Sequence, residues 1–378
     1  MRICKKCVYD ETIPHIKFDG GGVCNYCERD ITLNEEYPTG DEGKKILDDI
    51  IKKMKKEGRN YKYDVVVGVS GGCDSSYLLH LAVKSGLRPL AVHFDNTWNS
   101  KIAVENIERM ITSLGVDLYT HVVDNNEYND LVRAFFLSSV PDLDSGTDMA
   151  IGATLYEAAE KYDIKWIWNG HSFRSEGISP QGWFYQDAKY VRTIHRIFGT
   201  TGRLKTLPLM DFWPWMYQLL IKRIKRVRPL YYMDYDKEEV MKFLNKEYGW
   251  EWYGGHHMEN RSAYFVNNYY LPNKFNIDLR KCEYSALIRD GKMGRSEAIA
   301  KLSEKKPMDD SLILEMKKRL DLSDEQFERI MSGEKKNYTD YPTYKSRFEL
   351  LRPFFYVLYR LNLVPKSFYM KYARKQNY

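Results

Sequence analysis

The chain has 378 residues, 43% of them hydrophobic and 29% charged, so it can bury a core and is not a mostly disordered chain. Its length predicts about two to three domains. It has no run of about 18 apolar residues, which excludes a membrane-spanning helix.

The formal net charge of +6 is unevenly distributed. Residues 345–378 hold eight Lys or Arg and one acid, a local +7, which leaves −1 for the rest of the chain. This balance predicts no DNA-binding surface on the body. The first residues lack the apolar stretch of a secretory signal, so we expect a cytoplasmic protein with reduced thiols.

Four of the six cysteines lie in the first 27 residues, as Cys4-x-x-Cys7 and Cys24-x-x-Cys27. Two such pairs can converge on one tetrahedral metal, and four sulfur ligands leave no open position. The spacing therefore predicts a structural Zn²⁺ in a zinc-ribbon module over residues 1–43. Two disulfides or a redox role are the weaker alternatives. We expect a polar linker over 35–43 and a helix over 44–56.

The next segment predicts a buried strand over 63–69, a glycine turn and a helix that includes 77–83. The turn is Ser70-Gly71-Gly72-Cys73-Asp74-Ser75-Ser76. Backbone N–H groups in such a turn can hold phosphate at the helix N-terminus, and Asp74 can hold Mg²⁺. A Walker loop is excluded because the Lys-Ser/Thr ending is absent.

The run Ser70–Ser75 resembles the SGGxDS loop of the PP-loop (N-type) ATP pyrophosphatases, which have an adenine nucleotide alpha hydrolase-like (HUP) fold. The resemblance implies that ATP is split into AMP and pyrophosphate and that a carbonyl oxygen is adenylated. It implies catalytic roles for Ser70 and Asp74. It also implies a set of ATP contacts from the loop, namely Ser70, Gly71, Gly72, Asp74, Ser75 and Ser76.

Further strands are expected over 87–94, 118–123 and 165–169, with a helix over 101–114. This alternation predicts an α/β fold with a parallel sheet. The first of these strands ends at Asp95 and Asn96, and the last runs into Gly170 and His171. The PP-loop resemblance implies that both strand ends lie beside the nucleotide. His171 alone could also be a structural histidine.

The second half of the sequence points to a more specific family among the PP-loop enzymes. An aromatic helix is expected over 262–270, between Trp250-Glu251-Trp252-Tyr253-Gly254-Gly255-His256-His257 and the runs 271–281 and 285–298. Together with the cysteine pairs, these are similar to the N-acetyl sugar amidotransferases of lipopolysaccharide and flagellar sugar synthesis. The resemblance implies conversion of an acetamido group on a nucleotide-activated sugar, such as a UDP-diacetamido uronic acid, to an acetamidine. It also implies a separate glutaminase subunit that supplies ammonia.

Such a substrate would need cations for its phosphates and carboxylate, and the candidates are Arg174, Lys274, Arg280 and Lys281. A solvated surface is the alternative for each of them. Asp148 could bind sugar hydroxyls or cap a helix. His256 and His257 could be bases or structural residues.

Residues 219–228 predict a basic amphipathic helix, and a capping box at Ser323 predicts a helix toward Met331. The division we expect is a module over 1–43, a PP-loop domain over 44–305 and a helical extension over 306–378. The extension mixes aromatic and cationic residues, which suits RNA, anionic lipid at a membrane periphery, a protein, or internal packing.

Two rival functions remain. Some PP-loop enzymes thiolate tRNA and carry zinc ribbons, but they often need further cysteines, and only Cys73 and Cys282 are left here. A nucleotide-binding scaffold without catalysis is the other rival.

Overall fold

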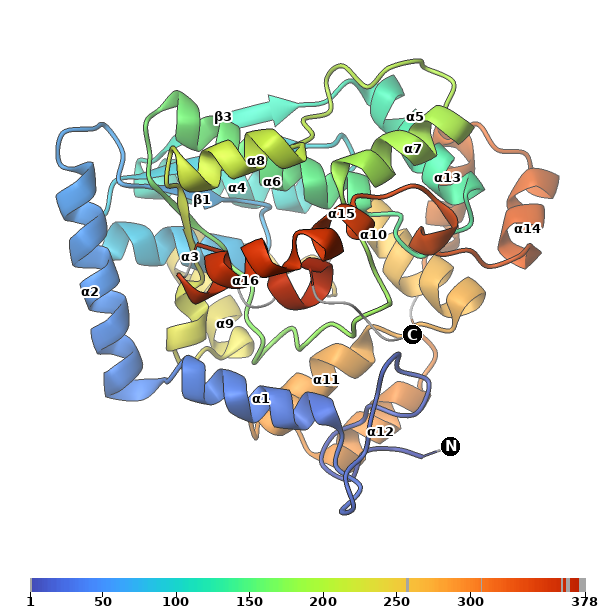
Figure 1. The fold of residues 1–378 in the computed structure, drawn as a ribbon, viewed down its shortest axis with the longest axis horizontal. Helices are drawn as coiled ribbons and strands as arrows, with labels where there is room; N and C mark the ends of the chain where they lie inside the picture. The colour runs from blue at the N-terminus through green and yellow to red at the C-terminus, as the bar shows by residue number, and fades with distance from the viewer. Residues whose placement is uncertain (1, 256–257, 307, 362, 365–367, 374–378) are drawn as a thin grey trace.

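The structure is a computed structural model that describes residues 2–255, 258–306, 308–361, 363–364 and 368–373 (Figure 1). Among these residues, five strands form one parallel sheet in the order β3-β2-β1-β4-β5. The strands are β1 (Val65–Gly68), β2 (Pro89–Asp95), β3 (Asp117–Val122), β4 (Trp166–Trp168) and β5 (Lys225–Val227). The predicted α/β class with a parallel sheet is confirmed.

The strand order reverses between β1 and β4. From β1 the chain builds outward through β2 to β3, then crosses back to place β4 on the other side of β1. In open parallel sheets, ligands bind outside the carboxyl ends of the strands at such a switch point. The loops after β1 and β4 are therefore placed together at the position where this fold binds ligands.

Helices cover both faces of the sheet, so β1 is buried on both sides. Val65 and Val67 belong to a core that also includes Leu78, whereas Val66 belongs to a second core that also includes Leu155. The first core receives α3 (Cys73–Lys84), α4 (Lys101–Leu114) and α9 (Lys237–Tyr248). The second core receives α6 (Ser145–Lys161). This alternation follows from the two-residue period of a strand.

The N-terminal cysteine module leads into α1 (Asn25–Glu36) and α2 (Gly40–Gly58), the two blue helices in Figure 1. The expected helix over 44–56 is confirmed within α2. The expected linker over 35–43 is wrong, because α1 extends to Glu36 and α2 already begins at Gly40. Apolar positions in 25–36 are sparse, and Tyr26 and Cys27 are the hydrophobic residues of α1 that are buried, so the sequence periodicity did not reveal α1.

The remaining helices lie around this core and along its C-terminal side. They are α5 (Asn125–Leu137), α7 (Ala188–Phe198), α8 (Phe212–Leu220), η1 (Pro229–Tyr232), α10 (Arg261–Phe265), η2 (Val266–Phe275), α11 (Arg280–Arg289), α12 (Arg295–Ser303), α13 (Asp310–Arg319), α14 (Asp324–Ser332), η3 (Tyr338–Asp340), α15 (Lys345–Leu350), α16 (Arg352–Arg360) and η4 (Tyr369–Ala373). Within the described residues, none of these helices combines the length and apolar character needed to span a bilayer.

The prediction of a basic amphipathic helix over 219–228 is wrong. Helix α8 ends at Leu220, Arg223 has a positive φ of 54°, and the chain then forms the edge strand β5. The left-handed residue ends the helix, and pairing with β4 satisfies the backbone of 225–227. The aromatic helix is confirmed as α10 and η2, and the capping box at Ser323 opens α14.

Candidate active site

A cavity of about 540 Å³ opens at the switch point, at the carboxyl ends of β1, β2 and β4. The loop after β1 lines it with Ser70 and Ser75, and the loop after β4 lines it with Asn169 and Gly170. Its far side is formed by the start of α6, the segment around Asn260, and η4. The volume lies in the range typical of small-molecule sites.

The loop after β1 is held open by its own hydrogen bonds. The Ser70 N–H donates to Ser75 Oγ at 3.2 Å, Ser75 Oγ donates to the Gly72 carbonyl at 3.1 Å, and the Gly72 N–H donates to Ser70 Oγ at 3.3 Å. Helix α3 begins directly after Gly72, and no side chain caps it. An uncapped helix N-terminus carries N–H groups and partial positive charge, which suits phosphate.

Gly71 cannot be replaced without moving the backbone. Its φ is 79°, and a Cβ there would collide with the carbonyl of Ala103 on α4. Its own carbonyl accepts hydrogen bonds from Asn106 Nδ2 at 3.2 Å and Trp250 Nε1 at 3.0 Å. Two distant segments thus fix the loop from outside, and its inner side faces the cavity.

The Asp74 carboxylate is engaged by residues that the sequence did not point to. Tyr235 donates to Asp74 Oδ1, and Lys237 Nζ lies 3.6 Å from Asp74 Oδ2. Burial lowers the pKa of Lys237, but the carboxylates of Asp74 and Glu176 outweigh this and keep that pKa above its ordinary value. Asp74 itself does not line the cavity, although its backbone is packed against Gly170, which does.

The turn after β2 presents an amide to the cavity. Asn96 lines the cavity; its Nδ2 donates to Tyr128 Oη at 3.1 Å and its Oδ1 accepts from Asn260 Nδ2 at 2.9 Å. Asp95 does not line the cavity and instead orders the turn, where it accepts from the Thr97 N–H at 2.8 Å. The structure therefore separates the two residues predicted beside the nucleotide.

His93, on β2, lines the cavity and was not predicted as a site residue. Its Nδ1–H donates to the Val69 carbonyl at 2.8 Å, and its Nε2 accepts from Asn99 Nδ2 at 3.2 Å. Burial lowers the pKa of His93, so the ring is neutral at physiological pH.

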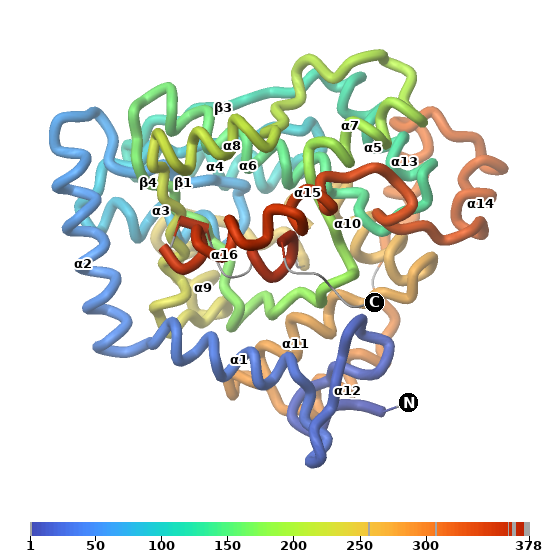
Figure 2. The backbone as a smooth tube through the Cα atoms, viewed as in Figure 1, coloured from blue at the N-terminus to red at the C-terminus, as the bar shows by residue number. Residues whose placement is uncertain are grey.

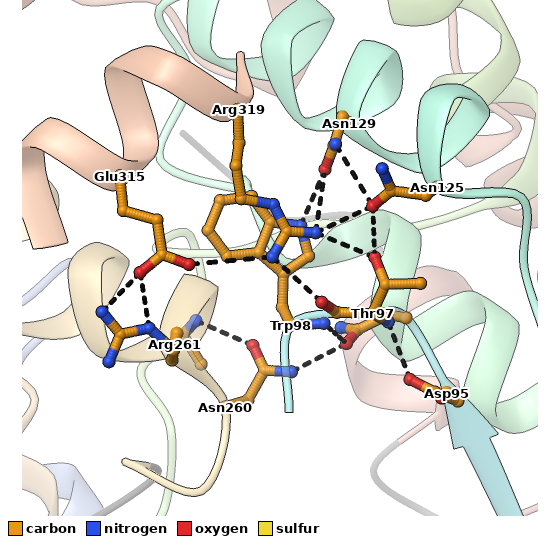
Figure 3. Close-up of polar contacts among 11 residues, drawn as sticks. Asp95, Thr97, Trp98, Asn125, Asn129, Asn260, Arg261, Glu315 and Arg319 are labelled. Carbon is orange, nitrogen blue, oxygen red and sulfur yellow. Dashed lines mark hydrogen bonds and ion pairs between the residues drawn. The ribbon is translucent and has the colours of Figure 1, made fainter. Parts of the chain in front are cut away.

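Helix α13 clamps the turn after β2, as Figure 3 shows. Arg319 donates to the Thr97 carbonyl and to Thr97 Oγ1, each at 2.9 Å, and to Asn125 Oδ1 at 2.9 Å. Its guanidinium lies 3.6 Å from the centre of the Trp98 ring. Thr97 has a positive φ of 65°. A strained turn of this kind persists only when its surroundings hold it.

The loop after β4 matches its predicted position in part. Gly170 lines the cavity, and the His171 N–H donates to Asn169 Oδ1 at 3.0 Å. The His171 ring instead lies at 3.1 Å from Tyr231 Oη, outside the residues that line the cavity. The imidazole therefore helps to hold the loop.

The far half of the cavity is acidic. Asp142, Asp144 and Asp148 line it, and Lys371 on η4 is the one cation among its described lining residues. Burial raises the pKa of Asp142 to about 7, although it accepts hydrogen bonds from the Tyr185 N–H at 2.7 Å and Tyr190 Oη at 3.1 Å. Asp148 lies in the first turn of α6, whose N-cap is Asp144, so it is not the cap.

The four cations predicted to bind substrate do not line the cavity. Arg174 is buried and donates to the carbonyls of Tyr231 at 2.6 Å and Tyr37 at 2.7 Å. Lys274 is buried and donates to the Ile330 carbonyl. Both hold backbone segments together.

The other two cations also join separate parts of the chain. Arg280 pairs with Asp278 at 2.9 Å and donates to the Lys301 carbonyl. Lys281 pairs with Asp10 of the cysteine module at 2.6 Å. Sequence proximity to polar residues did not reveal these partners, because most lie far along the chain. His256 and His257 lie outside the described residues.

Four cysteine thiols, all buried, meet at the N-terminus. The sulfur atoms of Cys4, Cys7, Cys24 and Cys27 lie within 4.8 Å of one another, and the closest pairs are 3.7–3.9 Å apart. A tetrahedral Zn²⁺ with Zn–S bonds of about 2.3 Å needs sulfur atoms about 3.8 Å apart, so the four thiols fit this ion. Cys73 and Cys282 are not members of the group.

Arg289 of α11 completes the surroundings of the cysteines. Its Nε lies 3.4 Å from Cys27 Sγ and its Nη2 lies 3.4 Å from Cys7 Sγ. Four thiolates around one divalent ion carry a net charge of −2, which a guanidinium partly balances. The cysteine module is therefore fastened to the C-terminal half of the chain through its sulfur atoms.

Comparison with known proteins finds a family match for the C-terminal part of the chain. Residues 259–354 match the family described as LPS biosynthesis protein WbpG-like, C-terminal domain. This segment includes Asn260 and Arg319, which bind the turns at the cavity. No curated protein sequence matches the chain.

Among solved structures, similarity is found to an NMN synthetase from Francisella tularensis, at 14% identity and a TM-score of 0.37, over 74% of this chain and 97% of that one. It is also found to an NH3-dependent NAD synthetase from Campylobacter jejuni subsp. jejuni NCTC 11168, at 16% identity and a TM-score of 0.32, over 74% and 93%. The chain therefore carries a WbpG-like C-terminal domain over residues 259–354, together with a parallel sheet that places the Ser70–Ser75 loop at its switch point.

Proposed function

We propose that the chain is an ATP-dependent sugar amidotransferase that converts an acetamido group on a nucleotide-activated N-acetyl sugar to an acetamidino group, in the making of lipopolysaccharide or a related surface glycan. One observation carries the proposal: a single cavity joins the phosphate-type loop at Ser70 and Ser75 to a set of carboxylates at Asp142 and Asp148. The first end suits a nucleotide triphosphate, and the second suits a hydroxyl-rich acceptor.

At the nucleotide end, the uncapped N-terminus of α3 and the loop amides would hold the phosphates of ATP. Asp74 stands in the first turn of α3 just outside the cavity lining, and its carboxylate oxygens are the donor type that Mg²⁺ takes. The ion would balance phosphate charge there, and Lys237 and Tyr235 keep the carboxylate in place.

At the acceptor end, carboxylates accept hydrogen bonds from sugar hydroxyls, since each carboxylate is an acceptor on both oxygens. Asp148 and Asp144 line the cavity and would take this role. An acceptor with several negative charges would meet repulsion from them, and Lys371 is the described cation able to offset it. The site therefore favours recognition of the sugar ring over recognition of phosphate at this end.

The reaction balances as follows. The amide oxygen bonds to the α-phosphorus of ATP and pyrophosphate leaves. Ammonia then bonds to the amide carbon, and AMP departs with the former amide oxygen, which leaves a carbon–nitrogen double bond. Positioning of the reactants would lower the barrier to both steps. Asp142, with its pKa near 7, is suited to take the proton that ammonia loses.

Ammonia would come from a separate glutaminase subunit. We place the reaction in the cytoplasm, where ATP is available and thiols stay reduced.

Cys73 and Cys282, the two cysteines outside the four-sulfur group, give no support to the tRNA-thiolating alternative. Burial raises the pKa of both Cys73 and Cys282 to about 12. A persulfide carrier needs a thiolate at neutral pH and access to its partner. Neither sulfur offers both.

The test is mass spectrometry of a UDP-diacetamido sugar after incubation with the purified chain, ATP, Mg²⁺ and ammonium. Replacement of O by NH lowers the mass by about one unit, with AMP and pyrophosphate formed in equal amount. Glutamine in place of ammonium should give no product without a partner subunit. Unchanged sugar under ammonium, or modification of bulk tRNA in its place, would contradict the proposal.

A further inference from the structure

We propose that helices α8, α15 and α16 form a docking surface for an anionic lipid bilayer. The inference rests on exposed apolar stripes and on the charges around them, and it is independent of the proposed reaction. The three helices pack around a hydrophobic cluster of their own, which includes Met216, Phe348 and Phe355. Figure 2 traces α15 and α16 in red near the C-terminus of the chain.

The first stripe follows α15 and α16. Leu350 is 80% exposed, Phe354 42%, Val357 53% and Leu361 61%. Phe354, Val357 and Leu361, at intervals of three and four residues, lie along one face of α16 and its C-cap. Leu351 is the turn that ends α15 and begins α16, so Leu350 stands at the end of α15 while the other three residues follow α16.

The second stripe follows α8. Trp213 is 75% exposed, Tyr217 45% and Ile221 68%, at intervals of four residues. The rings of Phe212 and Phe355 pack edge to face with centres 6.2 Å apart, which joins this helix to α16. Apolar patches rimmed by polar residues on a soluble chain mark interaction surfaces.

The charges beside the two apolar stripes favour an anionic binding partner. Five exposed arginines lie on or next to these helices, namely Arg223, Arg226, Arg347, Arg352 and Arg360. The two acids there are both paired: Asp211 lies 2.5 Å from Arg192, and Glu349 lies 3.3 Å from Lys345. Aromatic and aliphatic residues flanked by cations are the pattern of interfacial helices on anionic lipid.

A second copy of this chain fits less well, because a face-to-face dimer would bring like-charged arginines together. The surface also adjoins the cavity. Helix η4 packs against α15 and α16, and its Lys371 lines the acceptor half. Docking would therefore place the acceptor end of the cavity close to the lipid surface.

The experiment is flotation of the full chain with phosphatidylcholine vesicles that contain or lack phosphatidylglycerol. We expect binding to the anionic vesicles, weakened by salt because exposed charges are screened. Leu350→Glu with Val357→Glu should lower the bound fraction about tenfold or more by placing carboxylates in the apolar face. Arg352→Glu with Arg360→Glu should do the same while it leaves the apolar stripe intact.

The matched control is Leu314→Glu on α13, where the leucine is 66% exposed but lies away from these helices. It should float like the unmodified chain. Circular dichroism melts identify any variant that fails to fold. The inference fails if the unmodified chain stays out of the vesicle fraction, if the stripe variants bind as it does, or if Val357→Glu instead splits a dimer into monomers.

Discussion

The carboxylate of Asp74 is held by Tyr235 and Lys237. The motif identified Asp74, but not the pair that engages its carboxylate, since Tyr235 and Lys237 lie more than 160 residues away along the chain. It likewise gave no sign of His93. Such partners depend on which strands and helices pack together in the fold. The local sequence pattern does not predict this packing.

Replacement of Asp74 tests the nucleotide end of the cavity. Asp74→Asn keeps the shape of the side chain but removes the charge that pairs with Lys237 and that, in the proposed function, would hold Mg²⁺. We expect turnover to fall by about a hundredfold or more, as for other lost electrostatic groups, and the melting temperature to fall as well, because Lys237 loses a charge partner. Steady-state pyrophosphate release measures this. Asp41→Asn, at the exposed start of α2, is the control, and full activity in Asp74→Asn would remove Asp74 from the mechanism.

The raised pKa of Asp142 predicts a pH effect on stability. Between the unfolded value of about 3.9 and the folded pKa of about 7, the folded chain binds more protons at this group than the unfolded chain. The free energy of unfolding therefore falls as pH rises through this window and is level above it. Asp142→Asn stays neutral, so it should gain up to about 4 kcal/mol relative to the unmodified chain between pH 4 and pH 7.

Urea unfolding of both chains at pH 5 and pH 8 measures this difference. A gap that is equal at the two pH values would show that Asp142 is not held in an environment that disfavours its charge.

Single elements were predicted well where apolar periodicity was strong. Helix α4 begins and ends at the predicted residues 101 and 114, and β1 to β4 lie where the sequence placed them. Prediction failed at 219–228, where a helix-like pattern ends in a strand because β4 offers a free edge. The domain boundaries at 43 and 305 stay predictions.

The cysteine module is predicted to depend on metal. Cys24→Ser removes one of four sulfur ligands, so the purified variant should hold well under one zinc per chain and melt at a lower temperature. Metal analysis and thermal melts check both. Cys282→Ser is the matched control, because this buried cysteine is not a member of the four-sulfur group. A zinc-free unmodified chain would contradict the assignment.

Helix α13 is predicted to position the nucleotide site without contact to substrate. Arg319→Gln removes the guanidinium that donates hydrogen bonds to Thr97. The turn that presents Asn96 to the cavity should therefore become less well fixed. We expect KM for ATP to rise about tenfold with a smaller change in kcat, since the loss acts through placement. Lys318→Gln, its exposed neighbour, should change neither constant. If Lys318→Gln raised KM and lowered the melting temperature as much as Arg319→Gln does, Arg319 would have only a general structural role.

At the scale of the whole molecule, the sequence predicted the strands and loops that line one end of the cavity and not the elements that build its far half. Parallel topology follows from alternating strands and helices, and it places the loops after β1 and β4 together. The acceptor half is built from α6, η4 and the segment near Asn260, which converge only in three dimensions. The four cations that the sequence suggested as substrate ligands instead pair with groups in other segments of the chain, because buried cations need partners.

In the proposed reaction, the amide oxygen of the acceptor is transferred to AMP. It is tested most directly with a sugar whose acetamido carbonyl carries ¹⁸O, incubated with the chain, ATP, Mg²⁺ and ammonium. We expect ¹⁸O in the phosphate of AMP, one atom for each acetamidine formed. Acetamidine formed together with unlabelled AMP would contradict it.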